Sequence, residues 1–250
     1  MLFRSQNIYA TNYSNLTIAG TSGTKTLLGE TTVNGSLTIS RPLATNNYQL
    51  TIGGNFVQNN TFTQGTGTVI FNGSTAQNIS GSSATTFYNL TVNKISGELT
   101  LSKAISVTNI LSLQGGIVNT TASNLLTVTG TSVSAVTGGS ATAYVSGPLL
   151  RYLPASLSSG TSYNFPVGKS GSYYPFTLVN PLTGTNTITA LVEANTGNPG
   201  GNTDASLSSK STTEYWTLTT TGNFTNSSIS IARPSDITPY NSVAGSPTQS

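Results

Sequence analysis

The chain has 250 residues, of which 6% are charged, and its nine basic and six acidic side chains leave a formal net charge of +3. The absence of cysteine and histidine excludes disulfide bonds, thiol chemistry and the commonest general base. The basic residues form no run and no apolar stretch approaches the roughly 18 residues of a membrane span, so we expect neither nucleic-acid binding nor a membrane span.

Short apolar pairs separated by one residue recur over residues 1–140, with glycine- and asparagine-rich turns between them. The pairs recur at intervals of 21, 21 and 19 residues, which separate Leu16 from Leu37, Leu90 from Leu111, and Leu50 from Val69. Such an interval fits one coil of a parallel β-helix, whose strands stack coil on coil. Residues 1–140 are therefore predicted to form β-solenoid repeats with apolar side chains inside and Thr, Ser and Asn outside.

Two copies of one segment lie within this region, at residues 13–43 and 87–117. They align without a gap at an offset of 74 residues, and both contain an N-L-T run and the S-G and T-L pairs that follow it. Gapless apolar spacing of this kind is typical of stacked repeats. We expect the paired asparagines Asn15 and Asn89 to lie at turns, where their amides satisfy backbone groups.

The start of the chain suggests an interrupted repeat. A Q-N-I run precedes each copy, but a strand-like segment precedes only the second run, at Gln77, whereas five residues precede the first. We expect the chain to be a fragment of a longer protein, which would also explain why no signal peptide is seen; a native start at Met1 is the alternative. An open first coil also predicts self-association through residues 1–20, with another copy or with neighbouring repeats.

Residues 141–250 differ from residues 1–140 in composition and pattern: prolines are frequent, aromatic residues are concentrated, and the alternating segments are longer. Turns at residues 168–171 and 181–184 fit antiparallel hairpins. This pattern predicts an antiparallel β-sandwich module. The turn-rich C-terminal residues raise the alternative that the module is truncated.

Residues 71–92, FNGSTAQNISGSSATTFYNLTV, resemble the repeat unit of giant surface proteins of Bacteroidota and related bacteria. The F-P-V-G and Y-W-T-L pieces, at residues 165–168 and 215–218, are similar to the sandwich module that often follows those repeats. The resemblance implies an extracellular or outer-surface protein, exported by the type nine system through a C-terminal sorting domain. It also implies a role in adhesion, gliding or matrix building. No sorting domain is recognisable here, so the export route is inferred from the resemblance alone.

Some parallel β-helices cleave polysaccharides, a chemistry that needs clustered carboxylates on adjacent coils. The solenoid region contains only Glu30 and Glu98, and these do not occupy equivalent positions in the two copies. We therefore interpret them as solvated single charges and predict no catalytic residue.

Two candidate binding sites lie in the C-terminal half. The loop at 193–204 carries five side chains that could supply oxygen ligands to calcium, although such loops commonly only turn the chain: Glu193, Asn195, Asn198, Asn202 and Asp204. The aromatic residues of this half fill a sandwich core in the simpler interpretation. If Tyr174 and Trp216 point inward, however, strand alternation turns Tyr173 and Tyr215 outward as candidate sugar-binding residues.

The sequence thus predicts an all-β protein and a non-enzymatic extracellular surface module, used in adhesion or in building surface filaments or matrix. Its expected partners are other copies of itself, neighbouring repeats and surface glycans, with calcium as the one cofactor considered. The alternative is a carbohydrate-binding accessory region of a secreted polysaccharide-degrading enzyme.

Overall fold

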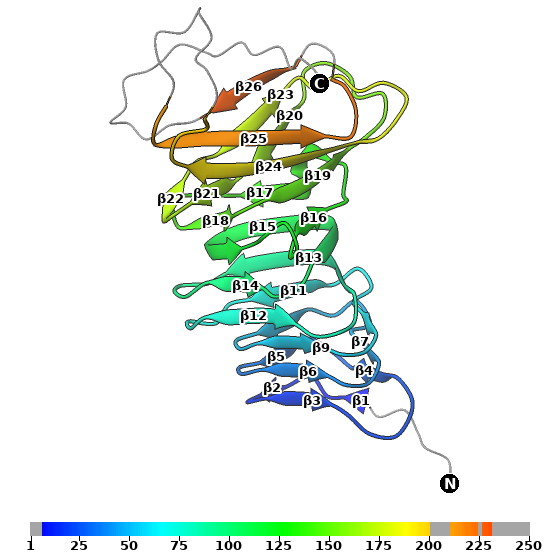
Figure 1. The fold of residues 1–250 in the computed structure, drawn as a ribbon. Helices are drawn as coiled ribbons and strands as arrows, with labels where there is room; N and C mark the ends of the chain where they lie inside the picture. The colour runs from blue at the N-terminus through cyan, green and yellow to red at the C-terminus, as the bar shows by residue number, and fades with distance from the viewer. Residues whose placement is uncertain (1–6, 201–210, 225–226, 232–250) are drawn as a thin grey trace, which may run out of the picture.

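A computed structural model describes residues 7–200, 211–224 and 227–231 of the chain. It is an all-β structure built on a parallel β-solenoid of about eight turns, which confirms the predicted class and the solenoid repeats (Figure 1). The described residues include no helix that is long and apolar enough to cross a membrane.

Three faces of short parallel strands form the lower coils. The first face contains β1 (Asn7–Ile8), β4 (Lys25–Leu27), β7 (Leu43–Ala44) and β10 (Phe62–Thr63). The second contains β2 (Asn12–Tyr13), β5 (Thr31–Val33), β8 (Leu50–Ile52), β11 (Thr68–Phe71) and β13 (Thr85–Asn93). The third contains β3 (Leu16–Ile18), β6 (Leu37–Ile39), β9 (Phe56–Gln58), β12 (Gln77–Ser80) and β14 (Leu99–Leu101).

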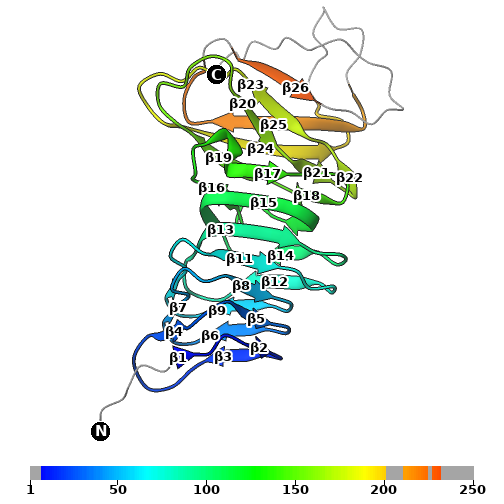
Figure 2. The ribbon, with the colours of Figure 1, turned by 180° about the vertical axis from the view of Figure 1, so that it is seen from behind.

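The upper coils merge these faces through the long bent strand β15 (Ile105–Asn119), which pairs with both β13 and β14. Above it lie β16 (Leu126–Val128), the 3-10 turn η1 (Val133–Ala135), β17 (Val136–Gly138) and β18 (Ala143–Ser146). The predicted boundary after residue 140 falls between β17 and β18, and both of these strands pair in parallel with β15. Parallel pairing then continues through β19 (Leu149–Leu153) and β21 (Val167–Lys169), as the view from behind also shows (Figure 2).

Antiparallel strands close the C-terminal end of this stack. Strand β19 pairs in parallel with β16 on one edge and antiparallel with β24 (Ile188–Thr196) on the other, and β24 pairs with β25 (Glu214–Thr220). On the third face, β22 (Ser172–Tyr173) folds back on β21. A separate antiparallel sheet contains β20 (Ser162–Phe165), β23 (Phe176–Val179) and β26 (Ser228–Ile231). The upper end of the solenoid therefore presents antiparallel strands rather than another coil.

The strand register matches the spacing predicted from the sequence. Leu16 lies opposite Leu37, Leu50 opposite Val69, and Leu90 opposite Leu111. Of the repeat positions expected in the core, Ile18, Leu37, Leu90, Val92 and Leu111 are buried. Leu16 is only half-buried, because it lies in the first coil, where no described coil covers the end of the core.

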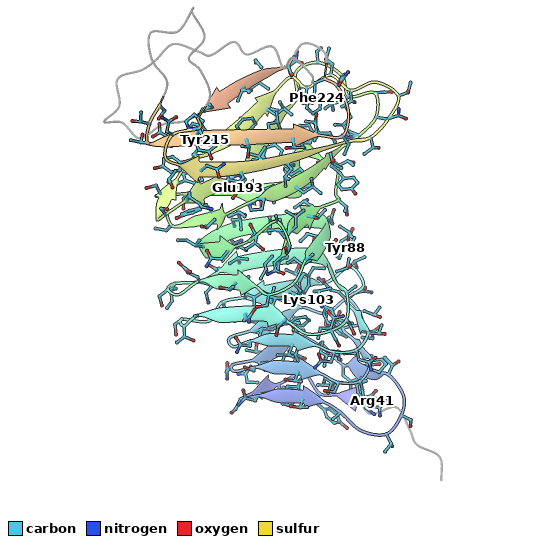
Figure 3. The ribbon with its side chains drawn as sticks, in the orientation of Figure 1. Arg41, Tyr88, Lys103, Glu193, Tyr215 and Phe224 are labelled. Atoms are coloured by element: carbon cyan, nitrogen blue, oxygen red, sulfur yellow. The ribbon has the colours of Figure 1, made fainter. Side chains whose placement is uncertain are left out.

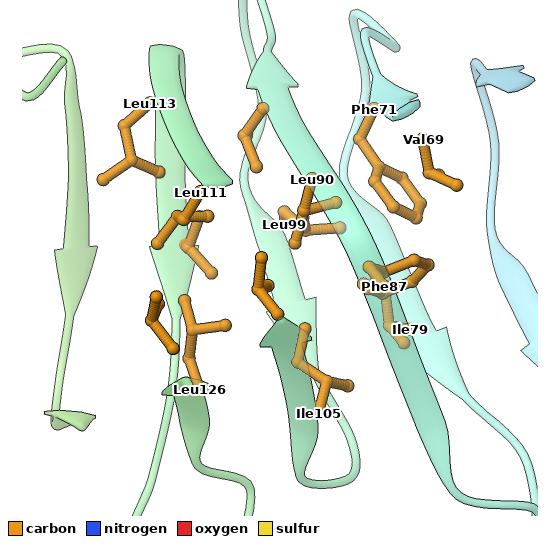
Figure 4. Close-up of a cluster of buried hydrophobic side chains, with 14 of the residues drawn as sticks. Val69, Phe71, Ile79, Phe87, Leu90, Leu99, Ile105, Leu111, Leu113 and Leu126 are labelled. Atoms are coloured by element: carbon orange, nitrogen blue, oxygen red, sulfur yellow. The ribbon is translucent and has the colours of Figure 1, made fainter. Parts of the chain in front are cut away.

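Apolar side chains fill the interior coil by coil (Figure 4). In the middle coils, the rings of Phe56, Phe62, Phe71 and Phe87 meet at centroid distances between 5.4 and 6.3 Å, mostly edge to face. Burying one such side chain contributes about 1.5–3 kcal/mol. The period-2 alternation of each short strand directs these residues inward, so the stack forms one continuous core.

A ladder of polar side chains connects successive coils at one corner. Ser36 N–H donates to Asn15 Oδ1 (2.7 Å), Asn55 N–H to Ser36 Oγ (3.1 Å), and Asn78 N–H to Asn55 Oδ1 (2.9 Å). Each side chain thus accepts a bond from the backbone of the coil above. This confirms the role predicted for Asn15. The turn predicted at Asn89 is wrong, because Asn89 lies within strand β13; its Nδ2 donates to the Thr66 carbonyl at 3.4 Å, and its Oδ1 accepts from the Asn109 side chain at 2.8 Å.

Candidate ligand-binding surface

Two faces of the β24–β25 pair differ in their chemistry. Ala194 lies opposite Trp216 on the inner face, where the Trp216 indole N–H donates to the Tyr174 carbonyl (2.9 Å) and the two rings meet edge to face at 6.0 Å. Strand alternation therefore places Tyr215 on the outer face, opposite Asn195. Tyr215 is half-buried there.

Asn195, opposite Tyr215, and Glu193 share this outer face of the strand pair, and Figure 3 labels Glu193 on β24 and Tyr215 on β25. Glu193 lies two residues along β24 from Asn195, and its Oε1 is 3.4 Å from Lys169 Nζ. Asn195 Nδ2 donates to the Glu193 carbonyl at 3.3 Å. Because both charged groups are about a third exposed, this ion pair contributes at most about 1 kcal/mol. An aromatic ring beside an ion pair and an amide can stack on an apolar face and exchange hydrogen bonds with hydroxyl groups. We call Lys169, Glu193, Asn195 and Tyr215 the Tyr215 surface.

Tyr173 belongs to a different environment. Its ring is 6.0 Å from that of the fully buried Tyr144, with a 37° angle between the planes. Burial raises the pKa of the Tyr173 hydroxyl, and burial, followed by the charge of Glu98, raises that of Tyr144. Tyr173 thus packs against the outer face of the upper coils. The structure does not combine it with Tyr215 into one platform.

The predicted calcium ligands are engaged in other contacts wherever the structure describes them. Glu193 pairs with Lys169, and Asn198 Oδ1 accepts from the Gly200 N–H at 2.9 Å. Asn202 and Asp204 lie outside the described residues. Within the described ranges, acidic, histidine and cysteine side chains form no group of three or more that could hold a metal. The calcium site remains a prediction.

The two solenoid carboxylates lie in exposed loops. Glu30 directly precedes β5, whereas Glu98 directly precedes β14 on another face of the stack. Glu98 Oε2 accepts from Asn119 Nδ2 on the next coil, at 2.5 Å. Through this hydrogen bond, Glu98 connects two successive coils at the surface of the stack.

Sequence reasoning missed a buried arginine at the junction with the C-terminal strands. Arg151 is 0% exposed, and its guanidinium donates to the carbonyls of Asn164 (2.7 Å), Ser132 (3.0 Å) and Val133 (3.1 Å). The same group lies 4.9 Å from the Tyr163 ring centroid. Burial lowers the pKa of Arg151 to about 10, so the side chain stays charged at neutral pH.

A second buried cation was missed within the coils. Lys94 Nζ donates to the carbonyls of Gly73 (2.7 Å) and Thr75 (2.9 Å) and to Gln77 Oε1 (2.7 Å). Burial lowers the pKa of this lysine. Lys94 therefore binds the turn of the coil below, and its contacts are structural.

No protein-family model matches this chain, and neither a curated protein nor a solved structure is significantly similar to it. The function is therefore argued from the geometry of the solenoid and of the Tyr215 surface.

Proposed function

We propose that this chain is a non-enzymatic extracellular surface module, in which the solenoid is a spacer for adhesion or for building surface filaments or matrix. The observation that carries the proposal is the coil-on-coil stack, in which one apolar core continues through the coils and parallel strand pairing continues from β2 and β3 up to β19 and β21. In such a stack each coil contacts only its neighbours, so length is gained by adding coils. The resemblance to bacterial surface repeats agrees with an extracellular location.

We further propose that the antiparallel strands of the C-terminal half form a β-sandwich carried by the solenoid. One layer is β19–β24–β25 and the other is β20–β23–β26. Arg151 of β19 packs on Tyr163 and Phe165 of β20, which supports face-to-face contact between the layers. The proposed partners are other copies of the chain, neighbouring repeats and surface glycans.

A specific observation favours the alternative of a carbohydrate-binding accessory region. The Tyr215 surface combines an aromatic ring, a carboxylate and an amide on one face of the β24–β25 pair with the ammonium of Lys169 from β21, which pairs with the carboxylate. Sugars present both apolar C–H faces and hydroxyl groups, so this combination suits them. Tyr173 remains a second candidate for the same role.

A glycan array with the full chain separates the two functions. The carbohydrate-binding alternative predicts binding that Tyr215→Ala abolishes and that Tyr48→Ala, at an exposed tyrosine of the solenoid, leaves unchanged. The spacer function predicts that binding, where present, survives both substitutions.

Location is tested separately on intact cells that produce the protein. An extracellular module is removed by added protease before any cytoplasmic marker is lost. Protection of the chain until the cells are lysed would contradict the proposal.

A further inference from the structure

The outer face of the β24–β25 pair brings four side chains together as two adjacent cross-strand pairs. Asn195 lies opposite Tyr215, and Glu193 lies opposite Thr217, which is exposed. Side chains at directly opposite positions of one face lie about 5 Å apart, and diagonal neighbours about 7–8 Å apart. One small ligand lying on the Tyr215 ring therefore reaches the Asn195 amide and the Glu193 carboxylate together.

The polar groups of this face keep hydrogen-bonding capacity for a ligand. Asn195 Nδ2 donates to the Glu193 carbonyl at 3.3 Å, and within the described part of the chain the Asn195 Oδ1 accepts no hydrogen bond. Glu193 Oε1 faces Lys169 Nζ at 3.4 Å, whereas an ionised carboxylate can accept about four hydrogen bonds. Hydroxyl groups of a ligand can therefore donate to both residues without displacing an existing contact.

The ion pair cancels the charge of the Tyr215 surface. Lys169 and Glu193 are both about a third exposed, so a ligand meets both charges. A sugar that carries a carboxylate is repelled by Glu193, which lies on the strand pair beside Tyr215. A sugar that carries an ammonium group is repelled by Lys169 and competes with it for Glu193. Uncharged hydroxyl groups meet neither penalty, so the surface favours neutral sugars.

The same ion pair bears on the predicted calcium ligands. Calcium takes about six to eight oxygen ligands, and Glu193 is the one carboxylate of the Tyr215 surface. A calcium ion bound to Glu193 would lie close to the Lys169 ammonium, which repels it. Lys169 thus supplies the positive charge beside Glu193, and a sugar needs no metal to find this carboxylate neutralised and held in place.

We propose that the Tyr215 surface recognises neutral sugars and that it does so without calcium. The C–H face of the sugar ring stacks on Tyr215, and hydroxyl groups at its edge donate to Glu193 and to Asn195. Lys169 is a positioning residue that neutralises and orients the Glu193 carboxylate. This inference rests on the carbohydrate-binding alternative of the proposed function and adds the charge class of the sugar.

Binding is measured by calorimetry with the full chain and three sets of oligosaccharides: neutral hexoses, their uronic acids and their unacetylated amino sugars. A neutral member should bind equally well in calcium and in EDTA, and its charged counterparts should bind at least about tenfold more weakly. Glu193→Gln should weaken neutral binding by about tenfold or more, because hydrogen bonds to a charged acceptor are stronger. The matched control is Glu98→Gln, at a carboxylate that also contacts an asparagine but lies on the solenoid, and it should bind as the unmodified chain does.

Reciprocal changes in charge preference test the ion pair itself. Glu193→Gln leaves the Lys169 ammonium unpaired, so uronic acids should bind this variant more tightly than the unmodified chain. Lys169→Gln leaves the Glu193 carboxylate unpaired, so amino sugars should gain affinity instead. The fluorescence transition of Trp216 in urea checks that both variants are folded. A loss of folding alone would weaken every set of sugars and reverse no preference.

The outcomes separate this inference from the carbohydrate-binding function on which it rests. A preference of the unmodified chain for charged sugars, or loss of binding in EDTA, would overturn the inference and leave carbohydrate binding in place. Charge preferences that neither substitution alters would overturn the roles given to Glu193 and Lys169. Binding of no sugar from any set would refute the inference and the carbohydrate-binding alternative together.

Discussion

Replacing Arg151 by methionine should destabilise the junction between the solenoid and the C-terminal strands. Methionine fills similar space but leaves the carbonyls of Ser132, Val133 and Asn164 without their donor. Hydrogen bonds to a charged group contribute about 1.5–3 kcal/mol each. Against this, burial lowers the pKa of Arg151 to about 10, so burying the charge costs on the order of a few kcal/mol. We expect a net loss of about 2–5 kcal/mol in the free energy of unfolding.

The assay uses the single tryptophan of the chain, Trp216 in β25. In urea, the fluorescence transition of Arg151→Met should move to lower denaturant than that of the unmodified chain. It should also precede the loss of the far-ultraviolet β-sheet signal, because the C-terminal strands lose their anchor first. Arg41→Met is the matched control, since Arg41 is exposed and donates to one carbonyl, that of Gly20; it should change stability by less than about 0.5 kcal/mol. An Arg151→Met chain as stable as this control would refute the reasoning.

Three further predictions follow from the coils. Leu90→Ala or Leu111→Ala should each cost roughly 2–5 kcal/mol of unfolding free energy in a urea titration, while Leu28→Ala, at a 44% exposed residue, should cost far less; equal effects would contradict the core assignment. Replacing Glu30 and Glu98 together by Gln should leave any polysaccharide-cleaving activity of the preparation unchanged, and its loss would overturn the non-enzymatic proposal. Burial lowers the pKa of Lys94 below its ordinary value of 10.5. At pH values between the pKa of the folded chain and that of the unfolded chain, the unfolded chain binds more protons than the folded one, so the free energy of unfolding rises with pH. The stability of the unmodified chain relative to Lys94→Met should therefore increase with pH below 10.5, and a constant difference in urea titrations across that window would contradict it.

The coil register was predictable because two periods act together. Alternation within each strand selects the inward residues, and the interval of 19–21 residues returns the chain to the same face, so Leu90 stacks on Leu111 and Leu50 on Val69. Leu16 departs from the prediction because it lies in the first described coil, which has a described neighbour on one side only. Its burial depends on a covering coil, not on its own sequence.

The extent of the parallel strand pairing was harder to predict from the sequence. Alternation looks the same in parallel and antiparallel strands, so the change of composition near residue 140 did not reveal that β18 and β19 still pair in parallel with the coils. Arg151, in contrast, could have been found, because it lies between Leu149 and Leu153 at the inward positions of one strand. Lys94 could not, since its acceptors belong to a turn about 20 residues earlier and converge only in the folded coil.

The most direct test of the solenoid is a set of backbone nuclear Overhauser effects in the folded chain. The stack predicts contacts that join Val69 to Leu90 and Leu90 to Leu111, each between parallel strands one coil apart. A chain of sequential antiparallel hairpins would instead give contacts between Leu90 and Leu101, because Leu101 lies in β14, the next apolar strand along the sequence. Observation of the first set supports the spacer on which the proposed function rests, and observation of the second in its place would contradict it.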